Sequence, residues 1–281
     1  MIKVDAHHHF WDPARKDYHW MPDDHPVLTL RYGPGDLVPL LDTHGIGKTI
    51  LVQAAQTIEE TEYLLAIADA TPSVAAVVGW IDFENKDHFS QLQRLKNHPK
   101  FAGVRPMIQD IADDNWMLGK DVQWAFAALV DLDLTFDALG FPRHLENFLT
   151  IFNRYPDLRA VIDHCMKPQI GDAGTGDAGF DFWAKGMTRI AQDTGAFCKL
   201  SGIVTETQGK WSVEKLRPYA AHVLSAFGTD RVMWGSDWPV CLLQADYGDW
   251  YQAAHALCEG LDDAGKANVF SGTALAFYQR R

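Results

Sequence analysis

Short apolar runs alternate with longer segments of helical periodicity along this chain of 281 residues. Eight of the runs are nearly continuous in apolar residues, as is typical of parallel strands that are covered on both faces. These runs are 2–5, 49–53, 74–81, 103–106, 134–137, 160–164, 197–201 and 232–237. Between them apolar residues recur every three or four positions, which indicates amphipathic helices. The helical segments are 59–70, 89–97, 145–155, 182–194, 213–227 and 272–278.

Strands and helices that alternate in this way predict an α/β protein, and eight strands in this length predict a (β/α)8 barrel of the TIM type. We expect a single domain over residues 1–281. The alternative is a doubly wound open sheet, which usually carries a glycine-rich phosphate-binding turn after its first strand, where this chain has histidines. The stretch 12–36 is long for a connection, so we expect a functional loop over the barrel mouth.

Polar side chains follow the predicted strands. In a (β/α)8 barrel the C-terminal ends of the strands form the active site. The strand-end residues are His7, His9, Gln53, Trp80, Asp82, Arg105, Asp137, His164, Ser201 and Asp237. Each type alone is common as a helix cap or a hydrogen-bonded polar group. Strands one and eight are neighbours in a closed barrel, so we expect His7 and His9 to lie beside Asp237, with His164 reaching the same pocket from strand six.

The first strand ends in three consecutive histidines. Side chains of a strand alternate between its faces, so His7 and His9 share one face and His8 points to the other. Two imidazoles on one face can hold a metal ion or polarise a substrate oxygen.

Composition narrows the classes of function. The formal net charge of −12 argues against a nucleic-acid surface, which needs basic patches. The sequence has no apolar run long enough to span a membrane and no secretory leader pattern, and its four cysteines form no CxxC pair. We therefore expect a cytoplasmic protein with reduced, buried thiols and a small-molecule substrate.

Four motifs resemble those of the amidohydrolase superfamily, in the branch called amidohydrolase-2, and they occur in that family's order. They are Asp5-Ala6-His7-His8-His9-Phe10-Trp11, Ile162-Asp163-His164 with Lys167-Pro168, Cys198-Lys199-Leu200-Ser201-Gly202, and Trp234-Gly235-Ser236-Asp237-Trp238-Pro239. Within this branch the chain is most similar to the sugar lactonases. The resemblance implies a distorted (β/α)8 barrel and hydrolysis of a sugar-acid lactone, L-fucono-1,5-lactone or a related aldonolactone.

The sequence also departs from the metal-dependent members of the superfamily. Many of those carry a carboxylated lysine or a glutamate after strand four, where this chain has Arg105, and a further histidine after strand five, where it has Asp137. A dinuclear metal centre is therefore not expected. His7, His9 and Asp237 can still hold a single zinc or manganese ion. Because the resemblance implies that lactonases often work without a metal, we expect that no cofactor is required.

Lactone hydrolysis needs an activated water, a polarised carbonyl and a proton for the leaving alcohol. We expect Asp237 to be the general base, with a pKa raised by the adjacent Trp234 and Trp238. His7, His9 and His164 would polarise the carbonyl. The residues expected to bind the substrate are Arg105, Gln53, Trp80, Lys167 and Trp20.

Two other readings remain open. One is a zinc-dependent amidohydrolase or decarboxylase on the same fold, and the other is a sugar-binding protein without catalysis. The sequence predicts neither the stereochemistry nor the ring size of the lactone, nor an oligomeric state.

Overall fold

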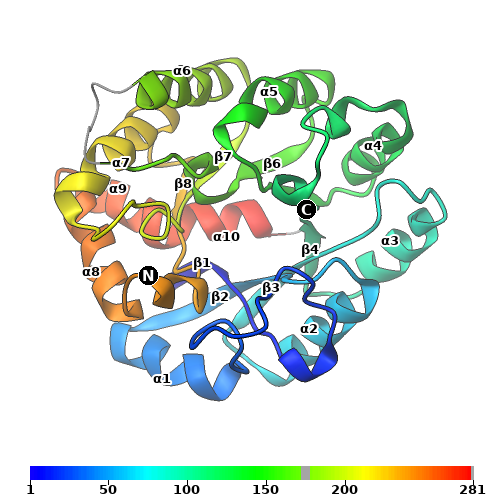
Figure 1. The fold of residues 1–281 in the computed structure, drawn as a ribbon, viewed down its shortest axis with the longest axis horizontal. Coiled ribbons are helices and arrows are strands. Elements are labelled where there is room, and N and C mark those ends of the chain that lie inside the picture. Colours follow the sequence, from blue (N-terminus) through cyan, green and yellow to red (C-terminus); the bar gives the residue numbers. More distant parts are fainter. Residues whose placement is uncertain (172–177, 280–281) are drawn as a thin grey trace.

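The structure is a computed structural model that describes residues 1–171 and 178–279. Eight parallel strands follow one another around a sheet in the order of the chain, so the predicted (β/α)8 barrel is confirmed (Figure 1). The strands are β1 (Lys3–His8), β2 (Ile46–Val52), β3 (Val74–Gly79), β4 (Phe101–Val104), β5 (Thr135–Ala138), β6 (Arg159–Ile162), β7 (Phe197–Leu200) and β8 (Val232–Trp234).

Helices follow the strands, mostly around the outside of the barrel (Figure 1). They are α1 (Pro34–His44), α2 (Ile58–Ala70), α3 (His88–Lys96), α4 (Gln123–Asp131), α5 (Leu145–Arg154), α6 (Ala178–Asp193), α7 (Val213–Phe227), α8 (Tyr247–Leu257), α9 (Asp263–Ala267) and α10 (Thr273–Tyr278). Within the described ranges, none of these helices combines the length and the apolarity that crossing a membrane requires.

Four of these helices were not predicted. One of them is α9, whose five residues are too few to show a helical period. Helix α1 starts inside the predicted loop, and prolines at positions 34 and 39 hide its periodicity. Helix α4 is mostly apolar, so it shows no amphipathic stripe. Helix α8 was not recognised among the aromatic residues of its segment.

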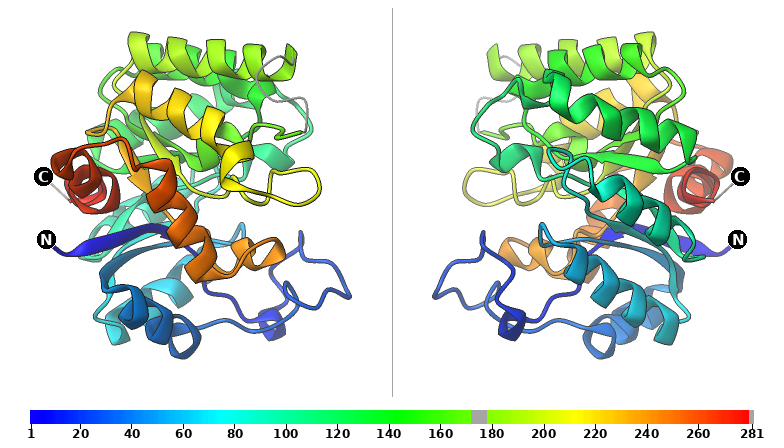
Figure 2. Two further views of the ribbon diagram at one scale, coloured as in Figure 1. Left: turned by 90° about the vertical axis from the view of Figure 1, so that its left-hand side faces the viewer. Right: turned by 90° about the vertical axis from the view of Figure 1, so that its right-hand side faces the viewer.

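A cluster of apolar side chains packs inside the barrel, so the barrel is a packed core and not a pore. Val4, Val52, Val78 and Met233 belong to this cluster, together with side chains of α10. Figure 2 shows α10 at the end of the barrel where β1 begins, opposite the long loop that follows β1. Since α10 covers the end where the strands begin, the residues described leave the C-terminal ends of the strands open for chemistry.

The barrel closes between its last and first strands through a few backbone contacts. The amide of His9 donates to the carbonyl of Trp238 (2.7 Å), and that of Asp237 donates to the carbonyl of His7 (2.8 Å). Strand β8 ends at Trp234, three residues earlier than predicted, and the chain then turns, with Asp237 at a φ of 55°. A Cβ at Gly235 would lie 2.7 Å from the Cβ of His7, so only glycine fits this seam. The closure itself places Asp237 beside the histidine pair.

Candidate active site

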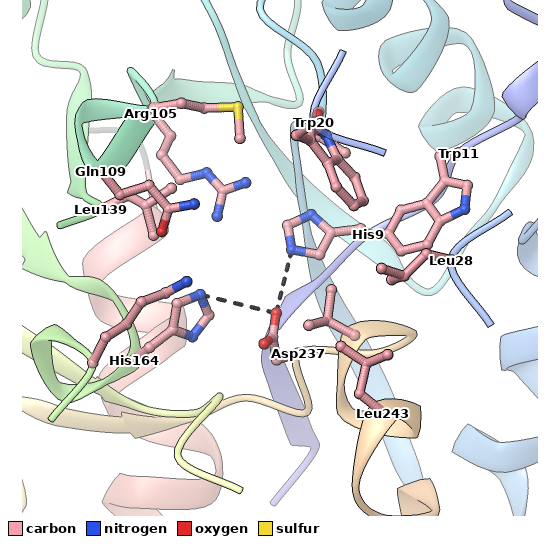
Figure 3. Close-up of a pocket in the computed structure, with 14 residues that line it drawn as sticks. His9, Trp11, Trp20, Leu28, Arg105, Gln109, Leu139, His164, Asp237 and Leu243 are labelled. Atoms are coloured by element: carbon pink, nitrogen blue, oxygen red, sulfur yellow. Dashed lines mark hydrogen bonds and ion pairs between the residues drawn. The ribbon is translucent and has the colours of Figure 1, made fainter. Parts of the chain in front are cut away.

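A pocket of about 200 Å³ opens at the C-terminal ends of the strands (Figure 3). This volume suits a single-ring molecule, because drug-sized ligands need roughly 300 Å³ or more. Its lining comprises His9, Trp11, Trp20, Leu28, Ala54, Arg105, Met107, Gln109, Leu139, His164, Lys167, Asp237, Val240 and Leu243. Six residues of the sequence-based prediction are among them. The others come from loops and short helical turns, whose course periodicity does not predict.

Asp237 lies at the centre of three imidazoles. Its Oδ1 is 3.3 Å from Nε2 of His9, 3.7 Å from Nε2 of His7 and 3.9 Å from Nε2 of His164. His7 is wholly buried behind the pocket, whereas His9 and His164 line it. The structure therefore brings together the four side chains that were expected to converge.

Hydrogen bonds define which imidazole nitrogens carry protons. His9 Nδ1 lies 2.8 Å from the carbonyl oxygen of Val52, which can only accept, so His9 donates from Nδ1 and has a lone pair at Nε2. The ammonium of Lys199 lies 3.0 Å from Nδ1 of His7 and can only donate. His7 therefore carries its proton at Nε2, which lies 3.1 Å from the lone pair of His9. Both histidines are neutral in this arrangement.

The electrostatics agree with neutral histidines. Burial, and then the charge of Lys199, hold the pKa of His7 well below its usual value. Burial also lowers the pKa of His9, and it lowers that of His164 to about 4.

The expected direction for Asp237 is wrong. Burial raises the pKa of Asp237, but the neighbouring imidazoles of His164 and His9 outweigh it, and the net pKa is lowered. The two neighbouring tryptophans do not set the pKa of Asp237. The ring of Trp234 packs against Tyr247 and Tyr251, and that of Trp238 packs against Tyr32. Asp237 is therefore ionised at neutral pH, as a general base must be.

His164 is held by a turn of unusual backbone geometry. Four consecutive residues, His164 to Lys167, have φ between 49° and 61°, a region that non-glycine residues rarely occupy. His164 Nδ1 lies 2.9 Å from the hydroxyl of Ser201, and a Cβ at Gly202 would lie 2.5 Å from that nitrogen. Strained backbone of this kind persists only where the surrounding structure holds it in place, and it is often found at functional sites.

A buried ionic cluster lies beneath the histidines, and the sequence reasoning missed its role. Lys199 Nζ is 2.5 Å from Asp137 Oδ2 and 2.9 Å from Asp163 Oδ1, and all three side chains are inaccessible to solvent. Burial raises the pKa of Asp137 to about 6, whereas Lys199 and His7 overcome the effect of burial on Asp163 and hold its pKa well below the usual range. A lysine inside the apolar run 197–200 was the available signal, because such a charge must be paired when it is buried.

Arg105 reaches the same cluster from the end of β4. Its NH1 lies 3.4 Å from Asp163 Oδ2 and 3.4 Å from Nε2 of His7, and the side chain is only 4% exposed. This places a positive charge at the pocket.

Two expected substrate-binding residues do not reach the pocket. Gln53 is wholly buried, where its side-chain amide donates to the backbone carbonyl of Arg105 (2.6 Å) and its backbone carbonyl accepts from the guanidinium of Arg105 (2.5 Å). It therefore positions Arg105. Trp80 follows the end of β3 and packs against His88, in a separate depression. The loop after β3 turns away from the barrel mouth at this point, which strand-end logic cannot anticipate.

The spacing of the expected metal ligands His7, His9 and Asp237 fits one divalent ion, which would replace the Nε2 proton of His7. Four ligands at about 2.0–2.1 Å from a zinc ion lie about 3.3 Å from one another. The three donor atoms are separated by 3.1, 3.3 and 3.7 Å. The lone pair of His9 Nε2 and the carboxylate of Asp237 face one another, which is the donor arrangement that a cation or a shared proton stabilises.

The chain is similar to known proteins over nearly its whole length. A family model described as amidohydrolase matches residues 4–280. The chain is 42% identical to an L-fucono-1,5-lactonase from Burkholderia ambifaria, over 99% of this chain and 96% of the relative. It is 31% identical, over the same shares, to an L-fucono-1,5-lactonase from Burkholderia multivorans.

Solved structures show the same fold. The crystal structure of an amidohydrolase from Burkholderia multivorans with bound zinc superposes with a TM-score of 0.92 at 32% identity and covers 100% of both chains. The family model spans nearly the whole chain, and two relatives exceed 30% identity over almost their full length. This chain belongs to the amidohydrolase family.

Proposed function

We propose that this chain hydrolyses a sugar-acid lactone, with L-fucono-1,5-lactone as the first substrate to test. The observation that carries the proposal is the ionised Asp237 among three imidazoles at the floor of a pocket sized for one sugar ring. Two relatives, at 42% and 31% identity, are L-fucono-1,5-lactonases.

In the proposed mechanism Asp237 removes a proton from a water molecule, whose oxygen attacks the lactone carbonyl carbon. The second O–H of this water donates to the lone pair of His9 Nε2 in place of the N–H of His7, and this orients the water. This differs from the polarising role expected for His9, because its Nδ1 proton is held by Val52. Asp237 then returns the proton to the ring oxygen as the bond between that oxygen and the carbonyl carbon breaks. The product is an open-chain hydroxy acid, which releases one proton to neutral solution.

The developing oxyanion needs hydrogen-bond donors. With the Ser201 hydroxyl donating to Nδ1 of His164, the imidazole of His164 presents an N–H at Nε2 to the pocket. Arg105 adds a guanidinium, and His7 adds an N–H at Nε2 from behind. A lactone is an activated ester, so we propose that these donors suffice.

The second candidate is a metal-dependent amidohydrolase or decarboxylase, and the fit of His7, His9 and Asp237 to one divalent ion favours it. A zinc or manganese ion held there would supply Lewis-acid polarisation of the carbonyl oxygen. Activity that is lost on chelation and restored by zinc would support this candidate. Full turnover after exhaustive chelation, with no metal by elemental analysis, would exclude it.

Substrate binding is proposed for three of the five expected residues. Arg105, Lys167 and Trp20 line the pocket, and Trp20 is fixed there because its indole N–H donates to the carbonyl of Ala54 (2.6 Å). Arg105 can bind hydroxyls or a carbonyl through its planar fork of donors. Trp20 offers an aromatic face for a sugar ring.

The test is proton release from a panel of D- and L-aldonolactones, with the metal content of the same sample measured. We expect rapid hydrolysis of L-fucono-1,5-lactone, and a loss in kcat of at least about 1000-fold in Asp237→Asn. Asp249→Asn, an exposed change on α8, is the matched control and should keep full activity. Hydrolysis of no lactone in the panel, with or without zinc, would overturn the proposal, and binding of lactone without turnover would identify a sugar-binding protein.

A further inference from the structure

The pocket has two unlike walls on opposite sides of its catalytic floor (Figure 3). Arg105 and Gln109 lie on one side, and we call them, with Lys167, the polar wall. Leu28 and Leu243 lie on the other side, and we call them, with Val240, the apolar wall. His9 and Asp237 lie between the two (Figure 3).

The polar wall has hydrogen-bonding capacity that the protein does not use. The Oε1 of Gln109 and the Nε of Arg105 are buried without a hydrogen-bond partner in the part of the chain that the structure describes. Lys167 Nζ is 3.8 Å from its acidic neighbour Glu206, which is too long for a hydrogen bond. Arg105, Gln109 and Lys167 all line the pocket, so this wall can exchange hydrogen bonds with the hydroxyl groups of a ligand.

The apolar wall offers no such capacity among the residues described. Leu28 is supplied by the long loop after β1, whereas Val240 and Leu243 belong to the short helical turn Val240–Leu243 that follows Asp237. The nearby indole N–H of Trp11 is already used, because it donates to the carbonyl of Leu30 (2.8 Å). A hydroxyl group placed against this wall would therefore lose its partners in water without replacement.

The chemistry of a 1,5-lactone matches this division. Its carbonyl carbon is flanked on one side by a carbon that bears a hydroxyl group. On the other side the ring oxygen leads to carbon 5 and its exocyclic substituent, carbon 6. With the carbonyl carbon at Asp237 and the hydroxyl-bearing edge on the polar wall, carbon 6 meets the apolar wall.

We infer that the apolar wall selects lactones whose carbon 6 is a methyl group over those that carry a hydroxymethyl group there, and that Leu28 and Leu243 are specificity-determining residues. This inference rests on the proposed lactonase function. An apolar pocket rejects an added hydroxyl group by up to about 100-fold. The expected preference in kcat/KM is therefore about 10- to 100-fold for the 6-deoxy lactone.

The test compares L-fucono-1,5-lactone with its 6-hydroxy counterpart, which differs only in that CH2OH replaces CH3. Leu28→Asn gives the wall a hydrogen-bonding amide of nearly the same size. We expect it to lower the preference for the 6-deoxy lactone about 10-fold, mainly by improving kcat/KM for the 6-hydroxy lactone. Leu30→Asn is the matched control, because Leu30 lies on the same loop, is 52% exposed and does not line the pocket.

Leu243→Asn tests the same wall from a different segment of the chain. It also replaces Leu28→Asn as the test if circular dichroism shows that Leu28→Asn does not fold. Equal kcat/KM values for the two lactones in the unaltered protein would overturn the inference. So would an unchanged preference in the folded Asn variants. Both results are distinct from failure of the proposed function, in which neither lactone would be hydrolysed.

Discussion

Replacing Lys199 by methionine tests whether the buried ionic cluster is a unit. The side chain of Lys199 is fully buried, and its ammonium lies 2.5 Å from Asp137 Oδ2 and 2.9 Å from Asp163 Oδ1. Methionine keeps the length of the side chain and removes its charge. Two carboxylates would then remain in the barrel interior without their common partner. Removal of one member of a buried ion pair costs about 3–5 kcal/mol, and we expect a loss of this size in the free energy of unfolding at pH 7.

The loss should depend on pH, with a defined sign. The pKa of Asp137 is already raised from 3.8 to about 6 in the folded protein. A folded-state pKa above the unfolded one means that stability falls as pH rises through this window. Without Lys199 the pKa of Asp137 rises further, and the window extends upward. Lys199→Met should therefore differ less from the unaltered protein at pH 5 than at pH 8.

Urea unfolding followed by circular dichroism at pH 5, 7 and 8 measures both effects. The double change Lys199→Met with Asp137→Asn removes one of the stranded carboxylates and should recover at least about 1 kcal/mol of the loss. Lys48→Met is the control, since Lys48 lies at the surface and its ammonium donates to the carbonyl of Pro72. A loss below about 1 kcal/mol in Lys199→Met, or the same loss at all three pH values, would refute the reasoning.

Three further predictions concern groups around the site. Burial raises the pKa of Glu60 to about 8, so stability should fall between pH 4.5 and 8, and Glu60→Gln should raise the melting temperature at pH 8 but not at pH 4. Ser201→Ala removes the partner of His164 Nδ1 and should lower kcat about 10-fold with little change in KM, which steady-state kinetics beside the exposed control Ser225→Ala would show. Tyr278→Phe removes a hydrogen bond of 2.8 Å to Asp137 and should cost about 1 kcal/mol in urea unfolding.

The architecture could be read from the chain because each strand is a distinct apolar run and eight of them alternate with helices. The predicted ends of the strands and helices were less accurate than the predicted fold, and the reason is physical. Strand β8 ends at Trp234 because the chain must turn to close the barrel at the backbone of His7, and this contact joins residues far apart in the sequence. No local pattern records such a closure.

A position at the end of a strand correctly predicted the pocket residues whose side chains point into the barrel mouth. It gave a wrong prediction where the side chain at the strand end points elsewhere. Gln53 and Arg105 both follow apolar runs. Gln53 is buried and holds Arg105 by a hydrogen bond, whereas Arg105 reaches the pocket. A shift of one residue decides which face a strand side chain takes, so the type of residue at a strand end does not settle its role. Trp80 illustrates the same limit, since the chain has already left the sheet at that position.

The pKa of Asp237 shows why the chemistry of a site is harder to predict than its location. Its sequence neighbours Trp234 and Trp238 suggested desolvation and a raised pKa. In the structure the groups that decide its pKa are His164 and His9, which come from other strands and outweigh burial. Electrostatic interactions at 3–4 Å depend on which strands meet, and adjacency in the chain does not report this. The tautomer of His7 follows the same rule, because it is fixed by Lys199, which lies 192 residues away in the sequence. The arrangement of charges at the barrel mouth is therefore a property of the closed barrel, and variants such as Lys199→Met test it more directly than changes to the histidines themselves.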